Sequence, residues 1–275
     1  MNATAFREAL GRRQPVFGSL VVSPSPVWLN TVSGLGLDYV FIDTEHIPID
    51  RQTLSWMCRA YEAAGIAPMV RIPSPDPYAA SMALDGGAAA ILAPYIETVE
   101  QVQALVGAVK HKPVKGARLA DMLAAPDSCP EQRAYAEAVN AGHSLLINVE
   151  SVPAMERLDD LLAVPGLDGI IIGPHDLSVS LGVPEQWTHP RFASAVETIL
   201  DTARRHGISA GMHVIYDDGP TQYARWRDAG ATIILHLADI LAFRFMLQRE
   251  LDDIRAIMGP TATANGAVNG AVGRV

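Results

Sequence analysis

The chain has 275 residues, of which 49% are hydrophobic and 19% are charged, as in an ordinary soluble globular protein. Its formal net charge of −9 argues against nucleic acid as a partner, and an anionic substrate would need a local cation. With no apolar run near the ~20 residues of a membrane span, no signal-peptide core and only Cys58 and Cys129 as thiols, we expect no membrane partner and a cytoplasmic location.

Short β-branched runs alternate along the chain with amphipathic helical stretches such as 50–65 and 191–207, the pattern of βα units around a parallel sheet. The predicted strands begin at Val16, Asp38, Ala67, Ala89, Ser144, Asp168, Ile208 and Ala231. Eight strands at this spacing predict an α/β fold, a closed (β/α)₈ TIM barrel. The alternative, an open doubly wound sheet, should carry a glycine-rich phosphate loop, and none is visible.

The connection between the fourth and fifth predicted strands is longer than one helix needs. A helix over 98–111 is followed by a further segment from roughly 113 to 141. Excursions of this length are typical of lids, binding loops or interfaces. The sequence after residue 258 is small, polar and repetitive, so we expect a single barrel domain over residues 1–258 and a disordered tail over 259–275.

Polar residues stand where several of the predicted strands end. In a TIM barrel the catalytic residues lie at the C-terminal ends of the strands, so these side chains should converge on one mouth. The candidates are Asp43, Thr44, Glu45 and His46 after the second strand, Arg71 after the third, Asn148 and Glu150 after the fifth, and Gly173, Pro174, His175 and Asp176 after the sixth.

Glu150 and Asp176 follow two neighbouring apolar strands, where two carboxylates repel each other unless a cation lies between them. Two carboxylates with room for water and substrate oxygens suit octahedral Mg²⁺ or Mn²⁺. A structural role is the alternative: one acid pairs with an arginine, or Asp176 is the N-cap of a helix that starts at Leu177. The spacing favours neither interpretation over the other.

Arg71 and His46 are the candidates for handling charge and protons. Arg71 follows an apolar run, and its guanidinium would hold a carboxylate or an enolate oxygen; a salt bridge to a neighbouring acid is the alternative. His46 could act as a general base near neutral pH, although a single histidine at a strand end is more often structural. No strand ends in a lysine, which argues against a Schiff-base mechanism.

Taken together, these segments resemble the HpcH/HpaI family of class II pyruvate aldolases. The matching segments are DYVFIDTEH, MVRIPSPD, ALDGGAAAILAPYIET, LLINVES and GLDGIIIGPHDLSVSLG, in the family's order and spacing over roughly Val16–Ile257. The resemblance implies a lyase that makes or breaks a carbon–carbon bond next to a pyruvate-type 2-oxo acid, through an enolate. The small-molecule partners would be the 2-oxo acid and an aldehyde, and the cofactor Mg²⁺, Mn²⁺ or Co²⁺.

The resemblance also implies roles for individual residues. Glu150 and Asp176 match the family's metal ligands. Arg71 matches the arginine that holds the pyruvyl oxygen and stabilises the enolate, and His46 matches the base. The backbone of Gly173, Pro174 and His175 would hold the substrate carboxylate.

Asp85 matches an aspartate that raises the basicity of the histidine, but it falls at the end of a helix, on the far side of its own barrel. Either Asp85 reaches a site through a subunit contact, or Asp43 is the partner of His46. Glu45 would then hold a metal-bound water.

The chain departs from the family pattern at three places that bear on the substrate. Asn148, a substrate-binding candidate, stands where the family commonly has Gln, and His175 stands where it commonly has a small residue. The family's glycine-arginine-glycine loop reads KGARLAD. These departures keep open a decarboxylase of oxaloacetate type or a specialised bond-forming synthase that uses the same enolate, and a non-catalytic metabolite-binding barrel is the third alternative.

By the same resemblance we expect a homo-oligomer, a hexamer or a trimer. The last predicted helix, DILAFRFMLQRELDDI over 239–254, is rich in bulky apolar residues. It is therefore predicted to form an interface or to cross into a neighbouring subunit.

Overall fold

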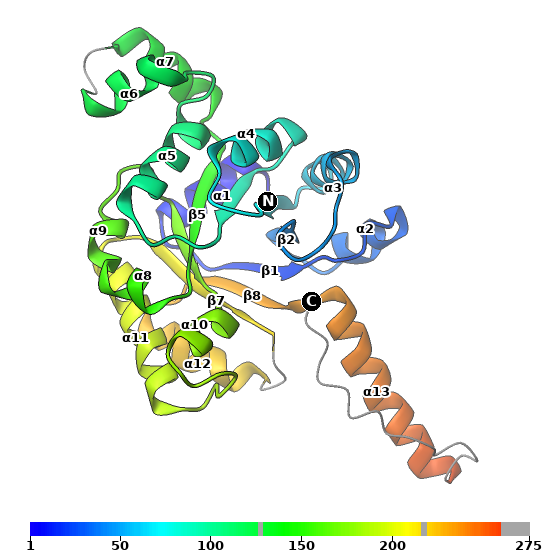
Figure 1. The fold of residues 1–275 in the computed structure, drawn as a ribbon. Helices are drawn as coiled ribbons and strands as arrows, with labels where there is room; N and C mark the ends of the chain where they lie inside the picture. The colour runs from blue at the N-terminus through cyan, green and yellow to red at the C-terminus, as the bar shows by residue number, and fades with distance from the viewer. Residues whose placement is uncertain (126–128, 216–218, 260–275) are drawn as a thin grey trace.

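Eight parallel strands close into a barrel in chain order in the computed structural model, which describes residues 1–125, 129–215 and 219–259, without the side chains of 219–222 (Figure 1). The strands are β1 (Val16–Leu20), β2 (Tyr39–Asp43), β3 (Ala67–Arg71), β4 (Ala90–Ala93), β5 (Ser144–Val149), β6 (Gly169–Ile172), β7 (Ser209–Val214) and β8 (Ile233–Ala238). β8 pairs with β1 to complete the ring. The predicted TIM barrel is confirmed, and residues 260–275 of the predicted tail lie outside the described residues.

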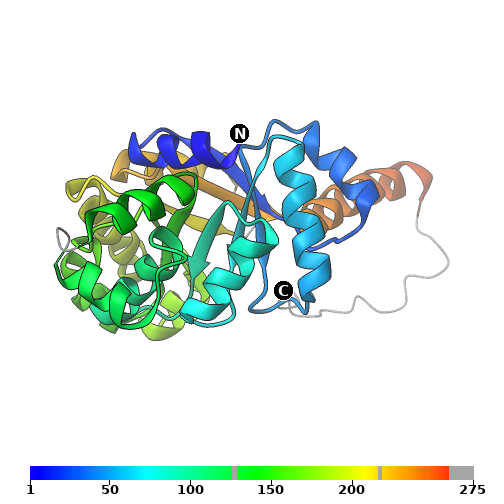
Figure 2. The same ribbon diagram turned by 90° about the horizontal axis from the view of Figure 1, so that it is seen from above.

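Helices surround the barrel and connect its strands (Figures 1 and 2). They are α1 (Ala3–Gly11), α2 (Pro26–Ser33), α3 (Arg51–Ala63), α4 (Pro77–Gly86), α5 (Val99–Lys110), α6 (Gly116–Ala124), α7 (Pro130–Val139), α8 (Val152–Glu156), α9 (Leu158–Leu162), α10 (Pro174–Ser180), α11 (Pro190–Arg205), α12 (Gly219–Ala229) and α13 (Asp239–Met258). Local chemistry fixes their ends. The Asp50 carboxylate, for example, accepts from the backbone N–H groups of Gln52 and Thr53 and so caps α3.

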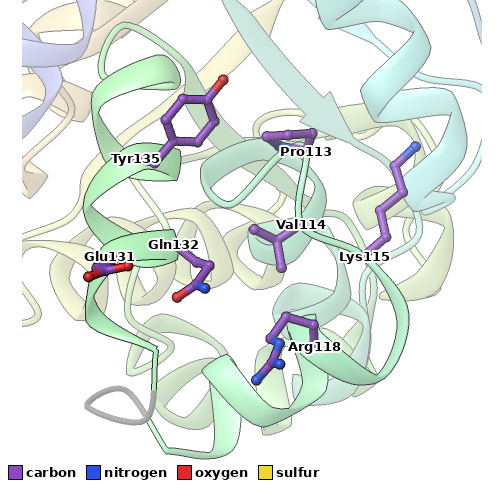
Figure 3. Close-up of a pocket in the computed structure, with 7 residues that line it drawn as sticks. All are labelled: Pro113, Val114, Lys115, Arg118, Glu131, Gln132 and Tyr135. Carbon is purple, nitrogen blue, oxygen red and sulfur yellow. The ribbon is translucent and has the colours of Figure 1, made fainter.

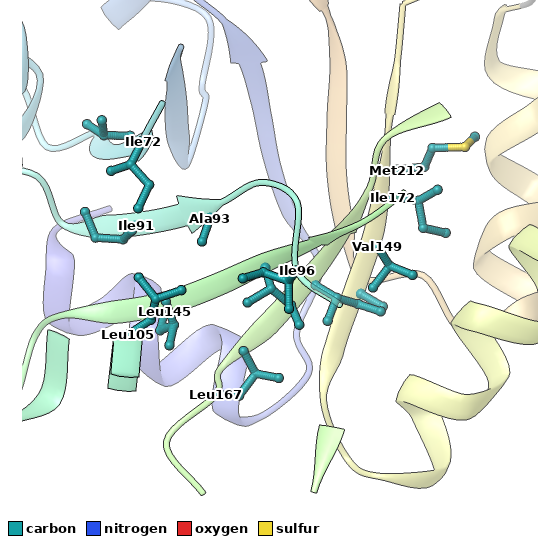
Figure 4. Packing of buried hydrophobic residues seen from close by; sticks show 14 of the residues in the cluster. Ile72, Ile91, Ala93, Ile96, Leu105, Leu145, Val149, Leu167, Ile172 and Met212 are labelled. Atoms are coloured by element: carbon teal, nitrogen blue, oxygen red, sulfur yellow. The ribbon is translucent and has the colours of Figure 1, made fainter. Parts of the chain in front are cut away.

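Side chains along each strand alternate between the barrel interior and the surface beneath the helices. The interior cluster includes Val16, Tyr39, Phe41, Ala67, Met69, Ala90, Leu92, Leu146, Ile171, Ile233 and Leu235. The intervening residues, among them Ile91 and Leu145, join a second cluster that packs beneath the helices (Figure 4). The same alternation turns Asp43, Arg71 and Asn148 toward the interior at the C-terminal end of the barrel.

Helix α1 closes the opposite end of the barrel. Phe6 and Leu10 belong to the interior cluster, and the Phe6 ring lies 5.3 Å from that of Tyr39, centroid to centroid. The Ser209 hydroxyl donates to the Leu10 carbonyl at 2.8 Å. Helix α1 therefore fills the N-terminal end of the barrel. Among the described residues, the C-terminal mouth is the end that stays open.

The long excursion after α5 forms the helices α6 and α7. A cavity of about 520 Å³ lies between them. It is lined by Pro113, Val114, Lys115, Arg118, Glu131, Gln132 and Tyr135 (Figure 3). Since α5 starts at the mouth and ends beside the N-terminal ends of the strands, this excursion does not form a lid over the mouth of its own barrel.

Helix α13 extends away from the barrel instead of packing along β8 (Figures 1 and 2). Its first residue, Asp239, is buried and accepts from the backbone N–H groups of Val22 and Ser23, both at 3.0 Å. Bulky apolar side chains farther along it are exposed, Phe243 by 60% and Ile254 by 52%. Within the described residues, no helix has the length and apolar character to cross a bilayer.

The close approach of β7 to β8 gives a test of the barrel. A Cβ added to Gly211 would lie 1.8 Å from the Ile233 carbonyl oxygen. We expect Gly211→Ala to lower the free energy of unfolding by about 3 kcal/mol, because the clash is with backbone and cannot be relieved by a side-chain rotation. Urea unfolding followed by circular dichroism would measure it.

Gly11→Ala is the matched control. It stands at the end of α1, where a Cβ would meet no atom within 4 Å, and alanine favours helix over glycine. Equal urea midpoints for the two variants would contradict the strand contact.

Candidate active site

Arg71 lies at the centre of the barrel mouth and is held by two acids. Its Nε and Nη2 donate to the two oxygens of Asp43 at 2.9 and 2.6 Å, and Nε lies 3.0 Å from Oε2 of Glu45. Its guanidinium carbon lies 5.4 Å from the centre of the Phe41 ring. The salt bridge that the sequence left as an alternative for Arg71 therefore exists, but with Asp43 and Glu45, not with Glu150 or Asp176.

The electrostatics of this pair follow from its burial. Burial by itself raises the pKa of Asp43, but the hydrogen bond and charge of Arg71 outweigh it, and the pKa is lowered. Burial likewise opposes the charge on Arg71, yet Asp43, Glu45 and Glu150 raise the pKa of the guanidinium above its ordinary value. Both groups are thus ionised, and Arg71 is a fixed positive charge at the mouth.

The Glu45 carboxylate links several site residues. Its side chain is 8% exposed, and Oε1 lies 3.7 Å from Nε2 of His46, whose own side chain is 47% exposed. The Tyr95 phenol lies beside this carboxylate, whose interaction and charge raise the pKa of the phenol to about 12. Glu45 is therefore close to three site residues, Arg71, His46 and Tyr95.

Glu150 is a buried carboxylate with little to balance its charge. It is 6% exposed, and Oε1 accepts from the Tyr95 backbone N–H at 2.8 Å. Burial, together with the charges of Asp176 and Glu45, raises its pKa to about 7 despite the opposing effects of Tyr95 and Arg71. A Cβ at Gly173 would lie 2.5 Å from Oε2, so glycine is needed there for the carboxylate to fit.

Asp176 lies in the first turn of α10, which begins at Pro174 after the N-cap residue Gly173. The alternative that Asp176 caps a helix starting at Leu177 is therefore wrong: the helix begins earlier, with proline at its first position. Within the described part of the chain, neither Glu150 nor Asp176 has an ion pair within 4.0 Å. A cation would remove the repulsion between the two acids.

The residues fit a divalent cation that takes its remaining ligands from elsewhere. Among residues 1–125, 129–215 and 219–259, no group of three or more His, Cys, Asp or Glu side chains could hold a metal ion. Glu150 and Asp176 would therefore supply two ligands at most with such side chains, which leaves positions for water and substrate oxygens, as Mg²⁺ and Mn²⁺ accept.

Asn148 presents a second unbalanced group near Glu150. It is 2% exposed, and its Nδ2 donates to the Ile171 carbonyl at 3.1 Å. Its Oδ1 is buried without a hydrogen-bond partner among the described residues. A buried acceptor of this kind is rare, and a bound molecule that donates a hydrogen bond would satisfy it.

His175 follows the proline that opens α10. Its Nδ1 lies 3.2 Å from Oε1 of Glu185, and its side chain is 35% exposed. Glu185 itself has a left-handed backbone with φ of 58°. The imidazole is thus held by a carboxylate beside one of the two candidate metal ligands.

Asp85 does not join the other candidates within one chain. Helix α4 leaves the mouth after β3 and returns to the N-terminal end of β4, so Asp85 near its end lies at the opposite end of the barrel. There it forms an ion pair with Lys112. Asp43, by contrast, is close enough to His46 for the imidazole charge to contribute to the lowering of the pKa of this carboxyl.

The sequence interpretation gave Glu45 only a minor role and assigned none to His213. The position of Glu45 at a strand end was the available signal for its place in the site. Tyr95 follows the fourth predicted strand, where an aromatic side chain could contact substrate but more often packs; its backbone N–H contact with Glu150 could not be read from the residue type. His213 points into the barrel at the end of β7, and its Nε2 lies 3.0 Å from the Leu237 carbonyl.

The comparisons with known proteins agree on one family. A family model described as HpcH/HpaI aldolase/citrate lyase matches residues 17–234. A 5-keto-4-deoxy-D-glucarate aldolase of Salmonella paratyphi C is 28% identical over 252 residues, which cover 91% of this chain and 96% of the relative.

Solved structures show the same similarity. An HpcH/HpaI aldolase from Desulfitobacterium hafniense DCB-2 has a TM-score of 0.77 and 26% identity, covering 92% of this chain and 97% of its own. A citrate synthase, SbnG, has a TM-score of 0.76 and 29% identity, covering 91% and 97%. The similarity therefore extends over nearly the whole chain.

His213 gives a pH test of the mouth. Burial is the main cause that lowers the pKa of its imidazole to about 4 from 6.5. Between these values the unfolded chain binds a proton that the folded chain does not, so this contribution to stability is complete above pH 6.5 and is lost as the pH falls toward 4. We expect His213→Gln to reduce the loss in free energy of unfolding between pH 7 and pH 4.5 by roughly 1–3 kcal/mol. Urea unfolding at pH 7 and pH 4.5 would measure it, and an unchanged difference between the two pH values would contradict the prediction.

Proposed function

The chain belongs to the HpcH/HpaI aldolase/citrate lyase family, and from this premise we propose the reaction of its barrel mouth. The protein is a metal-dependent carbon–carbon lyase of the class II aldolase type. We propose that the bond lies next to the carbonyl group of a pyruvate-type 2-oxo acid, as in a 4-hydroxy-2-oxo acid that splits into pyruvate and an aldehyde.

Glu150 and Asp176 would hold the cation, with Mg²⁺ or Mn²⁺ the proposed ion and Co²⁺ a substitute. The observation that carries this proposal is the buried Glu150 carboxylate, which has no ion-pair partner among the described residues and a pKa raised to about 7 by burial and neighbouring acids. When bound, the cation supplies positive charge against the enolate that forms when the bond is broken.

The remaining residues have roles that follow from their positions. Arg71, ionised and fixed by Asp43 and Glu45, stabilises negative charge on the substrate oxygen, and such preorganised charge is usually the largest catalytic contribution. His46, exposed at the mouth beside Glu45, would take the proton of the 4-hydroxyl group as the carbon–carbon bond breaks and return it to the enolate carbon, which becomes the methyl group of pyruvate.

The proposed substrate contacts lie at the ends of β5 and β6. The Asn148 Oδ1 accepts a hydrogen bond from the bound substrate or water. The backbone of Gly173, Pro174 and His175, at the start of α10, holds the substrate carboxylate, as helix N-termini hold anions. Asp43 is the proposed partner of His46 within one chain, and a role for Asp85 would require a second copy.

A second candidate reaction uses the same enolate in a decarboxylase of oxaloacetate type or in a bond-forming synthase. It is favoured by the 29% identity to a solved citrate synthase and by the His175–Glu185 pair beside the metal site. Product analysis with pyruvate, oxaloacetate and a panel of aldehydes would separate the two candidates. The cytoplasm remains the proposed location, since Cys58 and Cys129 form no disulfide in the described part of the chain.

We also propose that the chain forms a homo-oligomer, a trimer or a hexamer, through α13. An apolar cavity of about 340 Å³ lies on the outer face of β1 and β8. It is lined by residues that include Phe17, Val214, Trp226 and Ile234. The helix after β8 could cover this face, but α13 extends away (Figure 2). The proposed occupant is the α13 of a second copy, whose exposed Phe243 and Leu247 match the apolar lining.

The metal-dependent reaction is tested with oxaloacetate and with 4-hydroxy-2-oxo acids by following pyruvate release. We expect EDTA to abolish release and Mg²⁺, Mn²⁺ or Co²⁺ to restore it. Glu150→Gln should lower the rate by more than ~100-fold, beyond what is typical for residues that only orient a ligand. Glu197→Gln is the control and should retain full activity. Glu197 lies on α11 and forms an exposed ion pair with Arg225 of α12. Release that persists in EDTA and in Glu150→Gln would refute the proposal.

The oligomer is tested by light scattering of the full chain. We expect a mass of three or six copies, and a smaller mass for Phe243→Asp, because a charge in an apolar interface is costly. Asp253→Asn, an exposed change on the same helix, should leave the mass unchanged. A monomeric wild type would refute the proposed interface.

A further inference from the structure

Tyr95 has an unusual backbone for its residue type. It follows β4 with a φ of 53°, in the left-handed region that residues other than glycine rarely adopt. In this conformation its N–H points at Glu150 and donates to Oε1 at 2.8 Å. Such strain persists only where the surrounding structure holds it, and it is often associated with function.

The start of α5 holds this conformation in place. Gln101 Nε2 donates to the Tyr95 carbonyl at 3.3 Å, and Gln101 Oε1 accepts from the backbone N–H groups of Glu97 and Thr98 at 2.9 and 3.0 Å. The Thr98 hydroxyl in turn accepts from the Gln101 N–H at 3.3 Å. One capping box therefore fixes both the helix start and the direction of the Tyr95 N–H.

The Tyr95 side chain reaches the other half of the mouth. Its hydroxyl lies beside the Glu45 carboxylate, while the residue as a whole is 53% exposed. Glu45 lies 3.0 Å from Nε of Arg71 and 3.7 Å from Nε2 of His46. Packing does not account for an exposed ring in this position, whereas its two polar contacts go to two different site carboxylates.

We propose that Tyr95 is a positioning residue for the proposed enolate reaction, with its backbone N–H orienting Glu150 and its hydroxyl orienting Glu45. The inference rests on the proposed function of the mouth. Glu45 in turn sets the placement of Arg71 and His46, which act as charge develops and the proton moves. Loss of the hydroxyl should therefore lower the turnover number more than it changes binding, since the affected interactions strengthen in the transition state.

The test separates the side chain from the backbone. The reaction is the exchange of pyruvate methyl protons with deuterium in the presence of Mn²⁺, followed by NMR, and the affinity for Mn²⁺ alone is measured in parallel. We expect Tyr95→Phe to lower kcat for exchange by about tenfold, with KM for pyruvate and the Kd for Mn²⁺ within about twofold of wild type.

Tyr95→Gly and Tyr95→Val test the backbone. Glycine adopts the left-handed conformation freely and keeps the N–H in place, so it should bind Mn²⁺ like wild type yet exchange as slowly as Tyr95→Phe. Valine is disfavoured there, so the N–H should turn away and Mn²⁺ binding should weaken by about tenfold. Tyr135→Phe, an exposed tyrosine on α7 away from the mouth, is the control and should match wild type.

Each outcome has one meaning. Full exchange in Tyr95→Phe, or equal Mn²⁺ affinity in Tyr95→Gly and Tyr95→Val, would overturn the inference while leaving the proposed function intact. A wild-type protein that binds Mn²⁺ but exchanges no pyruvate protons would overturn the proposed function and the inference with it.

Discussion

The barrel mouth is organised around a buried acid that lacks a cationic partner in the described chain. Glu150 is almost fully buried, close to Asp176, and receives only a backbone N–H and the more distant influence of Arg71. Burying a carboxylate in this way is costly unless a cation is supplied. The buried carboxylate lies against Gly173, where the Cβ of a larger residue would collide with it.

Among the described residues, the cation that influences Glu150 is Arg71, and Arg71 already contacts other acids. Its two contacts with Asp43 and its approach to Glu45 fix a positive charge beside Glu150 without neutralising it. The mouth thus contains an ionised arginine held by two acids and, next to it, two acids in need of a cation. This division supports the proposed reaction, in which negative charge would develop on a substrate between Arg71 and a cation held by the two acids.

The strand ends and the parts between them differ in how far they could be predicted. Alternation of side chains along parallel strands brings Asp43, Arg71, Asn148 and Glu150 to one end, and this follows from strand boundaries alone. The direction of α13 cannot be predicted from strand boundaries, because a helix rich in apolar residues would pack equally well on its own barrel. Asp239, bonded to Val22 and Ser23, fixes the start of that helix in the tertiary structure.

The sequence by itself determined the closed eight-stranded barrel and the set of polar residues at its mouth, because strand periodicity and the positions of strand ends are local properties. Only the tertiary structure decided which of these residues touch. It paired Arg71 with Asp43, placed Asp176 inside a helix that begins at Pro174, and sent Asp85 to the far end beside Lys112. It also gave Tyr95 a left-handed backbone that directs an N–H to Glu150, because contacts between distant residues and a strained φ depend on packing that no local pattern encodes.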